Sequence, residues 1–466
     1  MTRSAVAVAA DGAATVQPPP LPARTASSTA TAWAVFTASV AATLVRGTGP
    51  FAYDAYGYWT AALRVAGAAP DALPGFWKLR GVLSGFVYAP AAALSRLAGL
   101  DVAGFAVLLQ NALLLAWVAA FLVPRAAAQW HPLSRRGQCL AAVLVWLAVS
   151  GFARYPLVDL YAAVGCLTVT VLLRSRRRSA LVLAGLVAGA AMNVRPAYVA
   201  TVIAIVVIAV AWHRWAGALV PIGVGVALVP QVVLNRVGFD AWSVSPVGTD
   251  KLMGLQAGYA AYITRYDTLL DADPPMQFYC SPGMASRVAT PPDSIAQLIA
   301  EFVGNAPTAA LFAMEKVASA LLWPQSAPYG TRTPGVDALF AAFITTITIV
   351  GIAALVRVAV RAGRTSTAAR RRPGAAVAAL ILGAVATVVG AAAETRFALP
   401  LVLVGLVGCT TLADVELDPR GASRRTRAWV LGTLAVTVAV TAIGYLGLAD
   451  PAPPGAVDLA TCAAQK

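Results

Sequence analysis

Long apolar runs alternate with short polar segments along most of the chain. Runs of roughly membrane-spanning length predict about eleven transmembrane helices, some of them short. They lie at residues 31–45, 102–123, 139–152, 157–173, 180–192, 197–211, 216–234, 336–360, 375–393, 397–413 and 429–448. The pattern therefore predicts an all-α polytopic membrane protein, with a single membrane domain over residues 30–449.

The composition agrees with this pattern. Of the 466 residues, 59% are hydrophobic and 12% are charged, which is about half the charge that a soluble protein carries. The core is therefore expected to consist of helix contacts and lipid. Residues 1–29, rich in Ala, Pro and Thr, predict a disordered tail, and residues 450–466 form a second tail.

The basic residues predict how the helices are oriented. Six polar segments on one side of the predicted spans hold 20 of the 35 Lys and Arg residues but only 4 of the 20 acidic ones. They are residues 1–29, 124–137, 174–178, 212–215, 357–373 and 414–427. The positive-inside rule places these segments in the cytoplasm, so an odd number of spans puts the C-terminus and most acids outside. The net charge of +15 therefore reflects topology, and no long basic surface with interleaved aromatics suggests nucleic acid.

Two outer segments, residues 47–101 and 235–335, are long enough to fold. In the first, residues 83–97 are apolar, but counting them as a span would place the arginines of 174–178 outside. We therefore expect a re-entrant or surface helix there. In the second, residues 294–322 predict two amphipathic helices, which lie either on the outer membrane surface or in a small packed cap.

Two acidic residues follow or open predicted spans on the outer side. Asp54 lies among five aromatic rings in residues 51–59, where the chain leaves the first span. A carboxylate at this interface is either solvated or functional. Asp159 opens the fourth span, where it is either a first-turn acid favoured by the helix dipole or a second functional acid.

Two arginines lie in tight outer turns. Arg195 precedes Pro196 between the fifth and sixth spans, and Arg396 lies two residues after Glu394 between the ninth and tenth. A cation on this side opposes the positive-inside bias, so each arginine is a candidate for binding a phosphate. The alternatives are that Arg195 extends to lipid headgroups and that Glu394 and Arg396 pair only with each other.

Several familiar kinds of site are excluded. His131 and His213 both fall in inner loops, so no histidine nucleophile or histidine-ligated metal is expected on the outer face. The sequence has no glycine-rich phosphate loop before a helix and no nucleophile elbow.

The order of these motifs resembles the GT-C superfamily of membrane glycosyltransferases. The resemblance is to bacterial members akin to dolichyl-phosphate-mannose protein mannosyltransferases and to the RgtA/B/C/D-like domain. It covers roughly residues 30–415. The matching features are Asp54 followed by Tyr58-Trp59 and Ala61-Ala62, then Tyr88-Ala89-Pro90, Asp159, Gly185 to Arg195-Pro196, and Glu394 to Pro400. Ala55 stands where the mannosyltransferase branch often has Glu after the Asp.

The resemblance implies a GT-C-type helix bundle in the cell membrane with an extracytoplasmic active site. The enzyme would transfer a sugar, with inversion, from a polyprenyl phosphate to a glycan, lipid or protein. Asp54 would be the general base, and Arg195 and Arg396 would bind the phosphate. Asp159 would position the acceptor or help hold a divalent cation such as Mg²⁺ or Mn²⁺. Glu394 and Tyr58 would complete the substrate site.

Two readings from other classes compete with this one. A transporter or a flippase for lipid-linked sugars predicts acids near the membrane midplane and broken helices in paired halves. A non-catalytic scaffold predicts no enclosed cavity around Asp54.

The cysteines allow one further expectation. Cys139, Cys166 and Cys409 lie in or at the ends of predicted spans and are interpreted as small apolar residues. Cys280 and Cys462 fall in outer segments, where an oxidising compartment favours a disulfide between them over two unrelated thiols.

Overall fold

The structure is a computed structural model. The structure describes residues 27–68, 75–130, 133–261, 263–269, 276–281, 292–331, 333–365, 372–413 and 424–449. Almost all of the elements in these residues are helices, which confirms an all-α membrane protein. The predicted tails at 1–29 and 450–466 lie outside the described residues, except that the first helix begins at Ser27.

Every apolar segment expected to span the membrane is helical. The corresponding helices are α1 (Ser27–Leu44), α6 (Ala103–Trp117) continued through η2 (Val118–Leu122) into α7 (Val123–Ala127), α8 (Arg135–Val149), α9 (Asp159–Leu172), α10 (Arg178–Val194), α11 (Val199–His213), α12 (Leu219–Phe239), α16 (Pro334–Thr365), α17 (Arg372–Val389), α18 (Leu399–Leu412) and α19 (Arg424–Gly447). Short 3₁₀ turns adjoin them at η1 (Leu100–Val102), η3 (Ser150–Arg154), η4 (Pro196–Tyr198), η5 (Arg214–Ala218) and η7 (Thr395–Ala398).

The number of membrane crossings is a separate matter from helicity. Within the described residues, 6 helical stretches are long and apolar enough to cross, the stretch over α11 and α12 counting as one. A bent pair of helices in the second outer loop would raise the number to 7. Four further apolar helices, which include most of α1, α9, α10 and α17, are shorter. A count of eleven crossings therefore stays a prediction.

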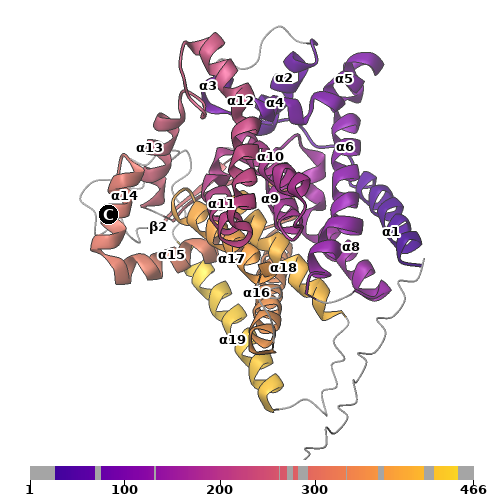
Figure 1. Ribbon diagram of the computed structural model, residues 1–466, viewed down its shortest axis with the longest axis vertical. Helices are drawn as coiled ribbons and strands as arrows, with labels where there is room; N and C mark the ends of the chain where they lie inside the picture. Colours follow the sequence, from indigo (N-terminus) through magenta and orange to yellow (C-terminus); the bar gives the residue numbers. More distant parts are fainter. Residues whose placement is uncertain are drawn as a thin grey trace, which may run out of the picture.

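The described residues of the predicted outer segment 47–101 form four short α-helices, α2 (Tyr53–Val65), α3 (Phe76–Leu79), α4 (Leu83–Val87) and α5 (Ala89–Ala98). They gather at the top of the bundle in Figure 1. The single helix expected at 83–97 is broken at Tyr88 because Pro90 lacks an N–H and its ring would clash with the preceding turn. Pro90 is tolerated in the first turn of α5.

The second predicted outer loop, residues 235–335, holds α13 (Thr249–Ala260), α14 (Ile295–Gly304) and α15 (Ala306–Leu321). The two predicted amphipathic helices are confirmed as α14 and α15, which meet at Asn305 with a bend of 117°. Their position relative to a membrane stays a prediction. Three strands that we did not anticipate accompany them: β1 (Ile263–Leu269), β2 (Met276–Ser281) and β3 (Tyr329–Gly330). They form a sheet of order β2-β1-β3, with β1 and β2 antiparallel and Ile263 opposite Ser281.

The core is centred on α18, in which every residue from Leu399 to Thr411 is buried. It packs against α16 through glycines, because a Cβ on Gly351 would lie 1.9 Å from the carbonyl oxygen of Gly405. Backbones approach this closely in membrane proteins only where one side lacks a side chain. By contrast, α19 packs along α15 and α16, as Figure 1 shows, and only 17% of its apolar window is buried. A large exposed apolar surface of this kind is typical of a helix that faces lipid.

Cys139, Cys166 and Cys409 are free thiols, and the last two are buried. The backbone of Cys280 lies in β2, but Cys462 lies outside the described residues. The disulfide between Cys280 and Cys462 therefore stays a prediction.

Gly81 tests how closely the chain before α4 packs against α10. A Cβ at position 81 would lie 1.7 Å from the carbonyl oxygen of Asn193. Gly81→Ala must therefore push the first outer loop away from α10, and we expect a loss of stability of about 1–3 kcal/mol. Thermal unfolding in detergent measures it. Gly432→Ala is the control, since a Cβ there meets no atom within 4 Å. Equal melting temperatures for the two variants would contradict this packing.

Candidate functional site

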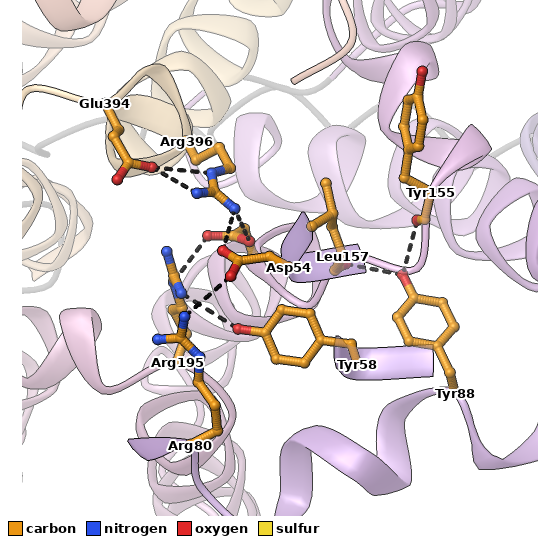
Figure 2. Close-up of polar contacts among 10 residues, drawn as sticks. Asp54, Tyr58, Arg80, Tyr88, Tyr155, Leu157, Arg195, Glu394 and Arg396 are labelled. Carbon is orange, nitrogen blue, oxygen red and sulfur yellow. Dashed lines mark hydrogen bonds and ion pairs between the residues drawn. The ribbon is translucent and has the colours of Figure 1, made fainter. Parts of the chain in front are cut away.

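The predicted site residues come together where several helices end or begin. Asp54 is the second residue of α2, Asp159 is the first residue of α9, and Arg195 directly follows α10. Arg396 lies in η7 just ahead of α18, and Glu394 directly precedes η7. Contacts link these residues and Tyr58 into one cluster (Figure 2). The structure therefore brings these residues together in one place.

Arg396 is the centre of the cluster. Its Nε and Nη2 donate to Oε2 of Glu394 at 3.1 and 2.7 Å, and its Nη1 donates to Oδ2 of Asp54 at 2.9 Å. The same Nη1 lies 3.8 Å from Oδ2 of Asp159. A guanidinium can serve several carboxylates because its five N–H groups form a rigid fork. The local pair with Glu394 therefore exists, and Arg396 also reaches beyond it.

Arg195 faces into the protein. Its Nε lies 2.9 Å from Oδ1 of Asp159, and its Nη1 donates to the hydroxyl of Tyr58 at 3.3 Å. The guanidinium also lies over the ring of Phe397, 5.3 Å from the ring centre. Because the residue is 5% exposed, the alternative that it extends to lipid headgroups is wrong.

Asp159 is fully buried at the start of α9, where the helix dipole favours a negative charge. Its contact with Arg195 is an ion pair without hydrogen-bond alignment, so neither of its oxygens forms a hydrogen bond within the described residues. The buried hydroxyls of Tyr198 and Tyr329 form none there either. Buried polar atoms normally have partners, so this cluster has the capacity to bind further polar atoms.

Arg80 is a site residue that sequence reasoning missed. It directly follows α3, and its Nη2 donates to Oδ1 of Asp54 at 3.2 Å. Its guanidinium carbon lies 6.0 Å from the centre of the Tyr58 ring. The signal was present, because Arg80 is a cation in the same outer loop as Asp54 and opposes the positive-inside bias as Arg195 does.

A strained turn presents Asp54 to these guanidiniums. Tyr53 has φ of 51°, a left-handed conformation that costs a non-glycine residue about 1–2 kcal/mol. Aromatic contacts hold the turn: the ring of Tyr53 lies 6.0 Å from that of Tyr329, which lies 5.2 Å from that of Tyr155. Such strain persists only where the surroundings impose it, and it is common at functional sites.

The charges of the cluster balance. Three carboxylates, those of Asp54, Asp159 and Glu394, face three guanidiniums, those of Arg80, Arg195 and Arg396. Burial alone would raise the pKa of Asp54, but the guanidiniums outweigh it and hold this pKa well below its usual range. Asp54 is therefore ionised at neutral pH. Its contribution to stability is present above the unfolded pKa of about 4 and is lost only as the pH falls through the lower folded value.

Two networks of buried side-chain amides hold the segments that carry the cluster. In the first, Asn111 donates to the carbonyl oxygens of Ala153 and Tyr155 and accepts from Tyr88. The hydroxyl of Tyr88 also contacts the carbonyl oxygen of Leu157 (Figure 2). These contacts fix the turn that leads into Asp159. Such networks specify one arrangement when their members are satisfied.

The second network fixes the loop that carries Arg80. The side-chain oxygens of Gln231 and Asn193 accept from the backbone N–H groups of Val82 and Leu83, both at 2.8 Å. Asn193 donates to Gln231, which in turn donates to Asn235. Because Asn193 lies two residues before Arg195, the network also ties Arg80 and Arg195 to the same support.

Lys316 of α15 holds the chain that leads to Glu394. It is fully buried, and its Nζ donates to the carbonyl oxygens of Ala260, Val389 and Ala391 at 3.1, 3.1 and 2.5 Å. These carbonyls lie at the C-terminal ends of α13 and α17, where a cation is favoured. The second outer loop therefore positions the site, which the sequence did not reveal.

Lys316→Met is expected to destabilise the protein. It leaves three carbonyl oxygens without their donor, and each buried unpaired group costs about 1–3 kcal/mol, partly offset by removing a buried charge. Thermal unfolding measures the effect. Lys251→Met is the control, because Lys251 lies exposed on α13. If Lys316→Met is as stable as Lys251→Met, the hydrogen bonds of Lys316 do not stabilise the packing of these helices.

The residues do not fit the divalent cation that the resemblance allows. Each carboxylate of the cluster already pairs with a guanidinium. Over the parts of the chain that the structure describes, no three His, Cys, Asp or Glu side chains are grouped so that they could hold a metal ion.

What the arrangement can do follows from its parts. It offers three guanidiniums that can bind an anion, one partly exposed carboxylate beside them, and buried polar atoms that can form further hydrogen bonds.

Comparison with protein-family models, curated proteins and solved structures found no match to this chain.

Proposed function

We propose that this protein is a membrane glycosyltransferase of the GT-C type with eleven transmembrane helices. It moves a sugar from a polyprenyl phosphate to a hydroxyl of a cell-envelope glycan, lipid or protein. The observation that carries the proposal is the contact of Asp54 with Arg80 and Arg396 at 3.2 and 2.9 Å. A carboxylate able to accept a proton thus lies beside two guanidiniums able to hold a phosphate.

The distribution of charge supports an extracytoplasmic site. The helix α9 begins at Asp159 in the cluster and ends just before Arg174, and α10 begins at Arg178 and ends just before Arg195. The end of these helices opposite the site therefore carries the basic segment 174–178. Basic loops mark the cytoplasmic side, so the cluster faces outward, where polyprenyl-linked donors of the outer leaflet reach it.

The guanidiniums bind the donor phosphate in this proposal. Arg80 presents its N–H groups on the open side of the cluster, Arg396 approaches Asp54 from within the protein, and Arg195 supports them from the buried side. Arginine suits this task because its planar fork matches the oxygens of a phosphate. Asp159 is fully buried behind Arg195, so we assign it to positioning that guanidinium rather than to contact with the acceptor.

The chemistry needs one base and no enzyme nucleophile. Asp54 accepts the proton of the acceptor hydroxyl while the hydroxyl oxygen attacks the anomeric carbon. The bond from that carbon to the donor phosphate breaks, and its electron pair leaves with the phosphate. The guanidiniums stabilise the added negative charge. Because the attack is direct, the configuration of the anomeric carbon inverts.

An assay that needs no knowledge of the sugar tests the proposal. Purified protein in nanodiscs is incubated with a lipid and cell-wall extract of its host, and lipid-linked sugars are followed by mass spectrometry. We expect one polyprenyl-phosphate sugar to be consumed and free polyprenyl phosphate to appear. A flippase would bind such a lipid but leave it chemically intact. If the lipid-linked sugars stay unchanged although the protein is folded, the proposal that it is a transferase is refuted.

A further inference from the structure

The Asp54 carboxylate occupies the position that suits a phosphate. Its Oδ1 accepts from Arg80 at 3.2 Å, and its Oδ2 accepts from Arg396 at 2.9 Å. The two arginines come from different parts of the chain, and Asp54 lies between them in Figure 2. A phosphate ester presents two oxygens to arginine in the same way. The carboxylate and the phosphate therefore compete for the same N–H groups.

Charge balance makes this competition unavoidable. The cluster has three carboxylates and three guanidiniums. A phosphate added to it would place an excess of negative charge in a largely buried region, which is unfavourable. One carboxylate must give up its guanidiniums if the phosphate is to bind them.

Asp54 is the carboxylate that can leave. Asp159 and Glu394 are buried, with side chains 0% and 5% exposed. The side chains of Asp54 and Arg80 are 28% and 23% exposed, so this pair forms the open side of the cluster. Water can solvate Asp54 after it separates from Arg80, whereas it cannot reach Asp159 in place.

We propose that the donor phosphate displaces Asp54 from Arg80 and Arg396, so that Asp54 becomes a free base only when the donor is bound. This inference rests on the proposed function. It orders the reaction: the donor binds first, and the acceptor hydroxyl is activated second. In the free site the lowered pKa of Asp54 makes it a weak base. Once the guanidiniums hold the phosphate, that pKa returns toward its usual range.

The test is the affinity for phosphate when the competitor is removed. Farnesyl phosphate is titrated into purified protein in nanodiscs by calorimetry, with farnesol and inorganic phosphate as separate arms. Asp54→Asn is expected to bind farnesyl phosphate about tenfold more tightly than the wild type, as removal of one charge-assisted competitor predicts. Asp54→Ala must repeat this gain, since it also removes the carboxylate.

Glu394→Gln is the charge-matched control. It also removes one negative charge next to Arg396, but from the buried side where Glu394 orients the guanidinium. We expect no gain from it. An equal gain in Glu394→Gln would mean a general effect of charge and would overturn the displacement.

The other outcomes separate this inference from the proposed function. If the wild type binds farnesyl phosphate and Asp54→Asn binds it equally or more weakly, displacement is overturned while the lipid-phosphate site stands. If the wild type binds inorganic phosphate as tightly as farnesyl phosphate, the site binds free phosphate, and the proposal of a lipid-linked donor is overturned. If the wild type binds neither, the proposed function itself fails.

Discussion

Asp54→Asn abolishes sugar transfer and leaves the protein folded. Asparagine keeps the shape of the side chain but cannot accept the acceptor proton, and loss of a general base lowers rates by about 10²–10⁴-fold. The variant loses the stabilisation that the ionised carboxylate gives, but the side chain of Asp54 is 28% exposed, so we expect the protein to stay folded. The rate of polyprenyl phosphate release and the melting temperature are measured on the same preparation.

Asp240→Asn is the control for this variant. Asp240 lies at the end of α12 with its side chain 84% exposed, and it pairs with Arg236 of its own helix. Transfer should be unchanged in this variant. A folded Asp54→Asn protein that transfers sugar at a rate near that of the wild type would contradict the role of Asp54 as the base.

Arg396→Gln is expected to lose both transfer and stability. The guanidinium contacts Asp54 and Glu394 directly, and its removal leaves the buried carboxylate of Glu394 without its guanidinium partner. Breaking a buried ion pair from one side costs about 3–5 kcal/mol. The donor phosphate also loses a central contact, so transfer should fall below detection. Thermal unfolding and the release assay measure the two effects.

Arg396→Lys separates these two effects. Lysine keeps the positive charge but lacks the fork, so it cannot serve Glu394 and a phosphate together. We expect it to retain more of the stability than Arg396→Gln and still to lose most of the transfer. Arg236→Gln, at an exposed surface position, should change neither quantity. An Arg396→Gln protein as stable and as active as Arg236→Gln would show that Arg396 is not the centre of the site.

The sequence predicted the helices because burial in a bilayer requires long apolar runs whose backbone groups bond within the segment. Most of the site residues could be identified from the sequence because a charge at an outer helix end is costly and unusual. They are Asp54, Asp159, Arg195, Glu394 and Arg396. Their shared location followed from the alternation of the spans. Even the division of residues 294–322 into α14 and α15 was visible, at Asn305-Ala306-Pro307.

Other features were harder to find. Arg80 is a cation in the same predicted outer loop as Asp54, but the contact between them depends on how the loop after α3 folds back, which no local pattern encodes. Lys316 bonds carbonyls from helices far away in the chain, and the amides of Asn193 and Gln231 act through backbone groups of another loop. The strands β1 and β2 are short and lie in a long polar loop, where tertiary context decides the conformation.

The strained turn at Tyr53 also escaped sequence reasoning. Tyrosine has no preference for a left-handed backbone, so its φ of 51° is imposed by the surrounding rings and helices. Local propensity and the observed conformation disagree here, directly before the proposed base. Such disagreement is expected where function rather than local preference selects the structure.

The most direct measurement of the central claim is mass spectrometry of lipid-linked sugars and cell-envelope glycans in a host strain. The gene is deleted and replaced either by the wild type or by Asp54→Asn, with equal amounts of folded protein in the membrane. The account predicts that the Asp54→Asn strain, like the deletion, accumulates one polyprenyl-phosphate sugar and lacks that sugar in one envelope glycan, lipid or protein. Identical lipid-linked sugars and identical glycans in all three strains would contradict it.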